Sequence, residues 1–330
     1  MSLKIKPITD AYKEELLYIQ KRFSGEIKSV KLPWNSWNKI YMDGWEWGWI
    51  ITIAGMSGSG KTAIWNILES AFFEQNPDEE FEILSFNFEM LARRLIGRKI
   101  SGELGKSLKK IYSADSSGNL TPEELAYIAD SLKSRTTNYP IHYVELPGTP
   151  KQIGDTILNF IRKNLEGSRK GLIVGLDHAT LVRRAAGFDE RTTLIELMSM
   201  FNEMKKIFPK SIFVILSQLN RNIEATERKS TYGASKALHY PQKSDIFGSD
   251  ALFQFSDAVI VPHRPEQLGL TKYGINDLPT KDLIYCHHMK NRDGQPVITR
   301  LKNNLEFNKL TELDERVNEG DINLYGPSNG

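Results

Sequence analysis

The segment 55–62, which reads GMSGSGKT, constrains this chain more than any other, because it matches the P-loop pattern G-x-x-x-x-G-K-[ST] at every fixed position. The apolar run 49–54 before it predicts a buried strand, and residues 63–73 after it carry apolar side chains at helical spacing. A glycine loop between a strand and a helix turns backbone N–H groups toward phosphate oxygens. The alternative, a glycine-rich turn without a ligand, is disfavoured by the complete pattern in this context.

The residues of this loop have predicted roles that follow from their chemistry. Lys61 is expected to reach the β- and γ-phosphates of a nucleoside triphosphate, and the Thr62 hydroxyl is expected to hold Mg²⁺. The other phosphate-binding positions are Gly55, Ser57, Gly58, Ser59 and Gly60. The positive end of the following helix adds to the attraction for phosphate.

Composition narrows the class of protein. The chain has 330 residues, of which 40% are hydrophobic and 25% charged, as in an ordinary folded protein. Its net charge of +2 gives no global basic field, so any nucleic-acid site must be local. The longest apolar runs, such as 212–216, are too short to cross a bilayer, and the N-terminus lacks the apolar stretch of a signal peptide. With a single cysteine, Cys286, no internal disulfide forms, and we expect a cytoplasmic protein without membrane contact.

The pattern along the chain predicts three regions: an N-terminal arm at 1–31, a large domain at 32–310 and a flexible polar tail at 311–330. The arm contains a helical stretch, 10–23, whose apolar side chains share one face and need a surface to dock on. In the large domain, strands are expected at 49–54, 82–88, 141–145, 171–177, 211–217, 257–262, 282–289 and 296–301. Helices are expected at 62–75, 90–103, 122–134, 150–165 and 190–207. This alternation predicts an α/β fold, a mostly parallel sheet with helices on both faces.

Four further segments carry polar residues at strand ends. Glu89 follows the second expected strand, where a carboxylate faces the γ-phosphate and orients the attacking water. Asp177 ends an apolar strand, as does the Walker B acid that organises Mg²⁺. The strand 213–217 leads into polar residues that begin with Gln218, and Asp-Gly in segment 290–294 indicates a hairpin turn. Each of these four segments, taken alone, could also be a solvated strand end or ordinary surface charge without a catalytic role.

Taken together, these segments resemble the ATPase domain of DnaB-type replicative helicases, which belong to the RecA-like superfamily. The resemblance covers about residues 12–310. Its most specific part is SQLNR at 217–221, and KNRDG at 290–294 resembles the hairpin that supplies a trans-acting finger. Further matching segments are LPWNSWNKI at 32–40, Glu89-Met90 followed by Leu95 and Arg98, NLTPE at 119–123, Asp245-Ile246 with Ser249, and SDAVI at 256–260.

The resemblance implies a RecA-like P-loop NTPase core and assigns roles residue by residue. Glu89 would be the catalytic base, Asp177 the Walker B acid and Gln218 the γ-phosphate sensor. Lys290 and Arg292 would form a finger pair that reaches the nucleotide of the neighbouring subunit. The implied enzyme is an ATP- and Mg²⁺-dependent homohexameric ring that moves 5′ to 3′ on single-stranded DNA and unwinds duplex. Its implied partners are single-stranded DNA and a primase, polymerase or helicase loader.

Several departures from the family pattern weaken the DNA assignment. Phe247-Gly248 stands where the family usually shows Arg-Glu, so one arginine contact to phosphate is lost, and Phe247 either stacks on a base or packs under the loop. Substitute DNA-binding residues are Arg228, Lys229, Lys236 and Lys243, with backbone N–H groups at Gly248 and Ser249. Only about 30 residues precede the core, which resembles a phage- or plasmid-encoded version or a chain shortened to the motor.

Other residues have two interpretations. His178, where the family often has Tyr, either senses charge beside the nucleotide or is structural, and the second is favoured. The pair His287-His288 does not favour a metal site, because neighbouring strand residues point to opposite faces. The tryptophans at 34, 37, 45, 47 and 49 pack at the domain entrance rather than stack on bases.

Two other functions remain open from the sequence. One is a RecA- or KaiC-like ATPase that forms filaments, against which SQLNR and KNRDG argue. The other is an ATPase that loads or regulates a partner without unwinding, which the altered DNA loop favours. Electron microscopy distinguishes the filament-forming ATPase from the helicase, because the first forms filaments and the second forms closed rings. Stimulation of ATP hydrolysis by single-stranded DNA distinguishes the helicase from the partner-regulating ATPase.

Overall fold

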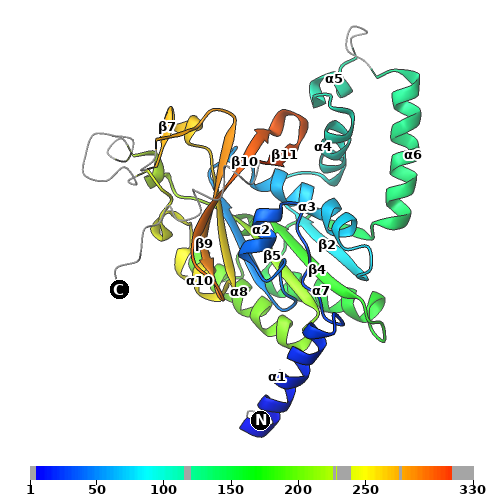
Figure 1. The fold of residues 1–330 in the computed structure, drawn as a ribbon, viewed down its shortest axis with the longest axis vertical. Helices are drawn as coiled ribbons and strands as arrows, with labels where there is room; N and C mark the ends of the chain where they lie inside the picture. Colours follow the sequence, from blue (N-terminus) through cyan, green and yellow to red (C-terminus); the bar gives the residue numbers. More distant parts are fainter. Residues whose placement is uncertain (1–4, 115–119, 226–227, 229–238, 275–276, 314–330) are drawn as a thin grey trace.

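A nine-stranded sheet forms the centre of the molecule (Figure 1). The structure is a computed structural model, and it describes residues 5–114, 120–225, 228, 239–274 and 277–313. The strand order of the sheet is β11-β10-β9-β6-β1-β5-β4-β2-β3. The strands are β1 (Ile50–Gly55), β2 (Phe81–Asn87), β3 (Ile141–Val144), β4 (Gly171–Asp177), β5 (Ser211–Gln218), β6 (Ala258–His263), β9 (Leu283–Asn291), β10 (Val297–Asn304) and β11 (Lys309–Glu312). A separate two-stranded sheet pairs β7 (Lys272–Tyr273) with β8 (Leu278–Pro279).

The sheet is parallel on one side and antiparallel on the other. Strands β3, β2, β4, β5, β1 and β6 run parallel, with Ile51 of β1 in register with Val214 of β5 and with Ala258 of β6. Strands β9, β10 and β11 continue the sheet beyond β6 as antiparallel neighbours. The prediction of a mostly parallel α/β sheet is confirmed. Because β1, β2, β4 and β5 are parallel, their carboxyl ends, which Glu89, Asp177 and Gln218 follow or occupy, meet at one end of the sheet.

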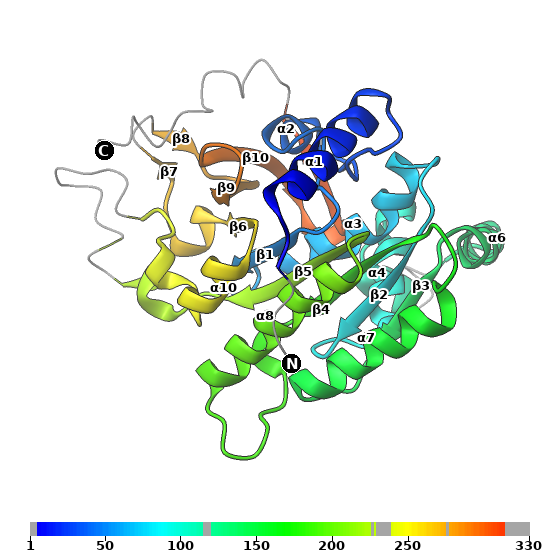
Figure 2. The same ribbon diagram turned by 90° about the horizontal axis from the view of Figure 1, so that it is seen from below.

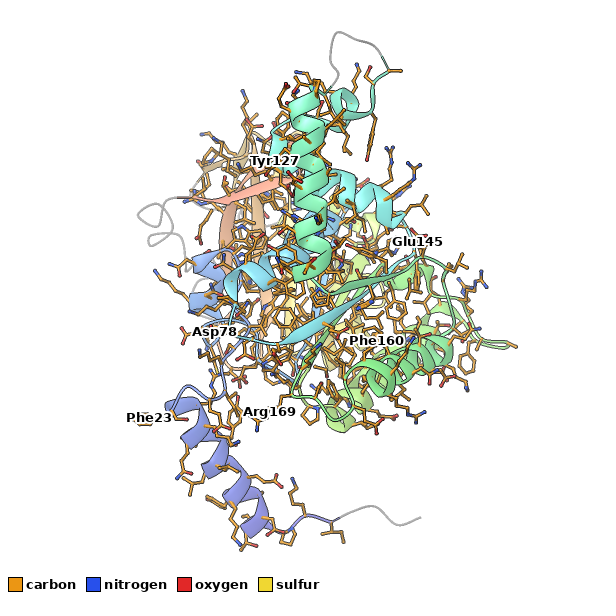
Figure 3. All side chains as sticks on the ribbon, turned by 90° about the vertical axis from the view of Figure 1, so that its right-hand side faces the viewer. Phe23, Asp78, Tyr127, Glu145, Phe160 and Arg169 are labelled. Carbon is orange, nitrogen blue, oxygen red and sulfur yellow. The ribbon has the colours of Figure 1, made fainter. Side chains whose placement is uncertain are left out.

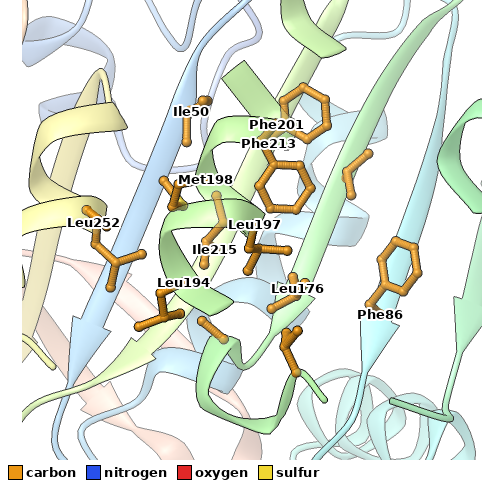
Figure 4. Packing of buried hydrophobic residues seen from close by; sticks show 14 of the residues in the cluster. Ile50, Phe86, Leu176, Leu194, Leu197, Met198, Phe201, Phe213, Ile215 and Leu252 are labelled. Atoms are coloured by element: carbon orange, nitrogen blue, oxygen red, sulfur yellow. The ribbon is translucent and has the colours of Figure 1, made fainter. Parts of the chain in front are cut away.

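Helices cover both faces of the sheet (Figure 2). On one face α7 (Pro150–Asn164), α8 (Glu190–Ile207) and α10 (Ser249–Phe255) bury apolar side chains in a common core. Figure 4 shows this core, in which Leu197, Met198 and Phe201 of α8 pack against Phe213 and Ile215 of β5. On the other face lie α2 (Asn35–Ile40) and α3 (Lys61–Gln75), within a second core. The predicted Trp packing is confirmed here, since Trp34, Trp37, Trp45 and Trp49 are buried and Trp47 packs against this core.

Two parts of the chain project from this body. The helix α1 (Ile8–Phe23) extends away from the sheet, and Figures 1 and 3 show it leaving the body near its C-terminal end. It has no buried residue, although Tyr18 donates a hydrogen bond to Glu46 at 2.8 Å. On the other side, α4 (Ala92–Leu104), α5 (Leu108–Tyr112) and α6 (Pro122–Asn138) stand beside β2 and β3. None of the helices in the described ranges is long and apolar enough to span a membrane.

Several elements differ from the sequence expectation. The short helices α2, α5 and α10 and the strands β7, β8 and β11 were not expected, because each is too short to show a clear period. Residues 311 and 312, which were expected in the flexible polar tail, instead belong to β11 and pair with β10. Burial of Leu310 holds this strand in place despite its polar neighbours. Residues 314–330 of the expected tail lie outside the described residues.

Candidate active site

The P-loop lies between β1 and α3, as the sequence predicts. Gly58 and Gly60 have φ values of 75° and 103°, which only glycine adopts without strain. A Cβ atom on Gly55 would lie 2.3 Å from the Ser59 hydroxyl, so the loop is also too tight there for a side chain. The turn therefore depends on its glycines. Gly60, Lys61 and Thr62 at the start of α3 line the same cavity as Ser57, and the first N–H groups of a helix are available to bind an anion.

Lys61 is a buried cation at the base of this loop. Its ammonium donates hydrogen bonds to the carbonyl oxygens of Gly55 at 2.7 Å and Met56 at 2.8 Å. Burial lowers the pKa of Lys61 to about 8, although Asp177 and Glu89 act in the opposite direction. A desolvated ammonium held by neutral carbonyls gains by meeting phosphate charge, which suits the predicted phosphate role.

Thr62 and Asp177 form a pair of hard oxygen donors. The Thr62 hydroxyl donates to Oδ2 of Asp177 at 2.8 Å, which places the end of β4 against the start of α3. Burial raises the pKa of Asp177 to about 6, and within the described part of the chain its Oδ1 has no hydrogen-bond partner. An orphaned carboxylate oxygen beside a hydroxyl fits Mg²⁺, which prefers oxygen ligands and keeps several waters. The residues present therefore fit the predicted metal.

Glu89, His178 and Gln218 converge from three strand ends. Glu89 follows β2, and its half-exposed carboxylate lies 3.5 Å from the His178 imidazole. His178 is buried, and its Nε2 lies 3.2 Å from the Gln218 amide nitrogen at the end of β5. Burial lowers the pKa of His178, and its Nδ1 bonds the Thr180 hydroxyl at 2.7 Å. The Nε2 atom of His178 therefore lies between the carboxylate and the amide and can hydrogen-bond to one of them at a time.

Most of these residues line one cavity of about 340 Å³, although Asp177 and His178 are not in its wall. From the sequence-predicted set it is lined by Ser57, Gly58, Gly60, Lys61, Thr62, Glu89 and Gln218. Sequence reasoning did not assign the rest of the wall as a site: Ala63, Met90, Arg98, Ser101, Leu108, Leu305, Glu306 and Asn308. The sequence identified Arg98 only as one residue of a family motif, without a role at the site. Burial lowers the pKa of Arg98. The segment 305–308 carries no motif, so nothing in its composition could have identified it.

The Lys290 and Arg292 pair lies at the opposite end of the sheet from the P-loop. β9 runs antiparallel to β6, so its last residues pair with the beginning of β6, Lys290 with Val259. Lys290 donates to the Phe253 carbonyl at 2.6 Å, and Arg292 pairs with the buried Asp257 at 2.7 Å. The Arg292 side chain is 52% exposed. Neither residue lines the P-loop cavity of its own chain.

Among the predicted DNA-binding residues that the structure describes, Arg228 and Lys243 both have acidic partners. Arg228 is nearly buried and bonds Asp245 at 2.6 Å and the Tyr240 carbonyl at 2.6 Å, so its charge stabilises the loop. Lys243 is half exposed, 3.7 Å from Asp250. Lys229 and Lys236 lie outside the described residues.

The loop around Phe247 packs inward. Phe247 is half-buried against the core cluster beneath α8 and α10, which favours packing over base stacking. Gly248 caps α10 with φ 65°, a Cβ there would lie 2.4 Å from Leu194, and Ser249 begins the helix. Gly248 and Phe247 line a second cavity of about 440 Å³ together with Asn220.

The two neighbouring histidines have separate environments, as the strand period predicts. His287 bonds the Tyr273 hydroxyl at 2.8 Å, whereas His288 bonds the hydroxyls of Tyr41 at 2.6 Å and Thr299 at 3.0 Å. No group of three or more metal-ligating side chains occurs in the described ranges.

Comparisons with known proteins agree with this arrangement. The sequence profile of the DnaB-like helicase C terminal domain matches residues 38–312, and no curated protein matches the sequence. The structure is similar to a solved structure described as an ATPase domain, with a TM-score of 0.74, 18% identity and coverage of 92% of this chain and 98% of that one. It is also similar to "The Structure Of A DnaB-Like Replicative Helicase And Its Interactions With Primase", with a TM-score of 0.72, 18% identity and coverage of 94% and 68%. A KaiC-like protein of Pyrococcus horikoshii OT3 is more distant, with a TM-score of 0.54, 12% identity and coverage of 87% and 100%. These likenesses confirm the predicted RecA-like α/β fold.

Proposed function

We propose that this chain, which belongs to the family of DnaB-like helicase C-terminal domains, is an ATP-driven motor that moves along single-stranded DNA and unwinds duplex during replication. The observation that carries the proposal is the convergence of Lys61, Thr62, Glu89 and Gln218 on one cavity. Asp177 joins this group through its hydrogen bond from Thr62. A phosphate cradle, a metal-binding pair, a carboxylate and an amide are the parts that NTP hydrolysis needs.

In this proposal each side chain has one task. Lys61 and the loop N–H groups bind the phosphates, and Thr62 with Asp177 would hold Mg²⁺, which neutralises charge on the phosphate oxygens. Glu89 orients and deprotonates the attacking water, because it is exposed to the cavity and stands at a strand end. Gln218 reports the state of the γ-phosphate to the chain that follows β5. Its amide and the Glu89 carboxylate both lie beside Nε2 of His178, so a nucleotide-dependent movement of Gln218 would change which of the two this atom bonds.

We also propose that catalysis is completed by a neighbouring subunit. Lys290 and Arg292 cannot serve their own P-loop, since they lie at the other end of the sheet. In a closed ring of six copies, the hairpin of one subunit would face the cavity of the next. The helix α1 supports the same assembly, because Tyr12, Leu16 and Ile19 are 72%, 57% and 54% exposed on one face and would be covered by an adjacent subunit.

The domain division and partners follow from this assembly. Residues 1–31 would act as the arm between subunits, and residues 32–312, which include β11, would act as the motor. A DnaB-like replicative helicase of similar structure is described with primase, which supports primase as a partner here. Movement 5′ to 3′ on the strand is the direction that the family resemblance implies.

The decisive experiment is unwinding of a forked DNA duplex with ATP and Mg²⁺. Strand separation is expected for the unmodified chain and not for Lys61→Ala. Forks that offer only a 5′ or only a 3′ single-stranded arm test the direction, and a reaction without Mg²⁺ tests the metal. ATP hydrolysis without any strand separation, on a fork with both arms, would refute the helicase proposal.

A second candidate function is an ATPase that regulates a partner without unwinding DNA. It is favoured by the loop after β5, where Arg228 is held by Asp245 and Phe247 packs inward. A RecA- or KaiC-like filament is a related possibility, supported only by the more distant fold likeness. Single-stranded DNA would leave the ATPase rate of a regulator unchanged but would raise that of a helicase. Electron microscopy with ATP separates closed rings from filaments.

A further inference from the structure

A buried hydrogen-bond acceptor without a partner lies in the wall of the nucleotide cavity. Asn308 is 8% exposed and lines this cavity together with Leu305 and Glu306. Among the residues that the structure describes, its carboxamide oxygen, Oδ1, has no hydrogen-bond partner. Buried polar groups in folded proteins are nearly always hydrogen-bonded, so an orphan acceptor beside a binding cavity points to a ligand that supplies a donor.

The orientation of this carboxamide is fixed by a relay of hydrogen bonds. The Asn66 amide nitrogen donates to the Leu95 carbonyl at 3.2 Å, which leaves the Asn66 oxygen toward Asn308. The Asn308 amide nitrogen then donates to that oxygen at 2.8 Å. A flip of Asn308 alone would place two carbonyl oxygens against each other, and a flip of both would break the bond to Leu95. The unpaired atom is therefore the oxygen.

The backbone also holds Asn308 in place. It follows the short helix η5 (Leu305–Phe307) with φ 47°, and its N–H donates to the Leu305 carbonyl at 3.1 Å. Asparagine tolerates this left-handed conformation better than most residues. Both the main chain and the side chain of Asn308 are thus preorganised, which lowers the entropic cost of a contact with ligand.

The position of Asn308 along the cavity matches the nucleobase rather than the phosphates. Glu89 and Gln218 mark the γ-phosphate end, and Lys61 with Thr62 mark the phosphate cradle at the start of α3. Asn308 instead contacts Asn66, one turn further along α3. A nucleotide whose phosphates lie in the loop therefore directs its base toward the wall formed by Asn308.

We infer that Asn308 selects the base of the nucleotide by accepting a hydrogen bond from the exocyclic amine of adenine. This inference rests on the proposed ATP-hydrolysing function and names the residue that distinguishes the base at that site. Guanine carries a carbonyl oxygen at the same ring position, which would face the Asn308 oxygen as a second acceptor. A purine without the amine would leave the Asn308 oxygen unpaired. The site therefore prefers ATP to GTP, on the order of tenfold to a hundredfold in affinity.

The test is a competition measurement of the affinities of ATP, GTP, purine riboside triphosphate and inorganic tripolyphosphate. Asn308→Gly removes the acceptor and keeps the left-handed backbone. The readout is the ratio of ATP to GTP affinity, which cancels effects of charge or folding that act on both nucleotides. Asn304→Gly is the matched control, because Asn304 precedes the same turn, is exposed and does not line the cavity.

The unmodified chain and Asn304→Gly are expected to prefer ATP to both GTP and purine riboside triphosphate. Asn308→Gly is expected to bring the three nucleotides within about twofold of each other and to leave tripolyphosphate affinity unchanged. A preserved ATP preference in Asn308→Gly would overturn the inference and leave the proposed function intact. If no nucleotide and no tripolyphosphate bound the unmodified chain, the proposed function would fail first.

Discussion

Lys61 and Glu89 meet the nucleotide cavity in opposite ways, one buried and one half exposed. The Lys61 ammonium is desolvated, and in its proposed role it contacts the phosphates already in the ground state. Among the described interactions, Glu89 has no contact with the P-loop. In its proposed role it acts when water attacks the γ-phosphate, so it contributes mainly to the transition state. Substitutions of these two residues should therefore separate binding from chemistry.

We expect Lys61→Ala to weaken ATP binding, because it removes a cation that contacts the phosphates. Glu89→Gln is expected to bind ATP with nearly unchanged affinity while turnover falls by about 10²–10⁴-fold, because the amide keeps the shape but is not a base. Equilibrium binding of ATP and steady-state hydrolysis, measured on the same preparations, check both. Equal hydrolysis rates in Glu89→Gln and the unmodified chain would remove Glu89 from the mechanism.

His288 gives a second prediction at the scale of the residue, one that concerns stability against pH. Burial lowers its pKa to about 3, and its ring lies between the hydroxyls of Tyr41 and Thr299. The unfolded chain binds a proton near pH 6.5 and the folded chain does not, so stability is full above pH 6.5 and is lost as pH falls toward 3. At pH 5 the loss from this residue alone is about 2 kcal/mol.

Urea unfolding at pH 7.5 and pH 5 tests this prediction. His288→Gln, which offers one donor and one acceptor to the same hydroxyls but does not titrate, is expected to lose less stability over that interval. Because His263 and His287 are also buried with lowered pKa values, both proteins become less stable in acid, and the difference between them isolates His288. An identical pH dependence in the two proteins would rule out the titration.

At the scale of elements, Arg292 in the hairpin between β9 and β10 forms an ion pair within its own subunit and is also the proposed finger for the neighbouring subunit. Arg292 pairs with Asp257, whose carboxylate also accepts from Lys205 and from the Ile50 backbone. Asp257 therefore keeps two partners when Arg292 is lost, and the fold should survive its removal. This makes Arg292 suitable for a test of catalysis between subunits.

Arg292→Ala alone should lower ATP hydrolysis by on the order of 10³–10⁵-fold, the usual contribution of an arginine finger. Mixing Arg292→Ala with Lys61→Ala subunits creates some interfaces in which both groups are intact, so partial recovery of hydrolysis is expected. Arg169→Ala, an exposed arginine before β4, serves as the matched control and should hydrolyse ATP normally. Full activity of a monomer that carries Arg292→Ala would disprove the finger assignment.

At the scale of the whole molecule, the sequence predicted the parts of the fold that have a strong period and the parts of the site that have a motif. The strand 171–177 and the helix 190–207 were predicted at their observed ends, because an apolar run and a capped amphipathic pattern define them. The segment 305–308 was not predicted as a wall of the site, because its position depends on β11, which adds to the sheet edge far along the chain. The inward ion pair of Arg228 was missed for the same reason, since its partner Asp245 is brought near only by the fold.

The last prediction concerns how the whole assembly would grip DNA. A net charge of +2 gives no bulk attraction, so the proposed channel needs local cations. Because Arg228 is committed to Asp245, the candidates that remain are Lys243, half exposed beside Asp250, and Lys229 and Lys236 outside the described residues. Charge reversal of Lys236 and Lys243 should weaken single-stranded DNA binding and flatten its dependence on salt by about 0.7 in logarithmic slope per lost phosphate contact.

Fluorescence anisotropy of a labelled oligonucleotide over a range of salt concentrations measures both quantities. Lys151→Glu with Lys163→Glu changes the net charge equally on exposed positions of α7, so it controls for long-range electrostatics. A specific grip requires a larger loss of affinity and a flatter slope for the loop variant than for this control, because only close contacts release condensed counterions. If the two variants behaved alike, the loop after β5 would not be the DNA site. The inward packing of Phe247 and Arg228 would then favour a motor that acts on a partner protein.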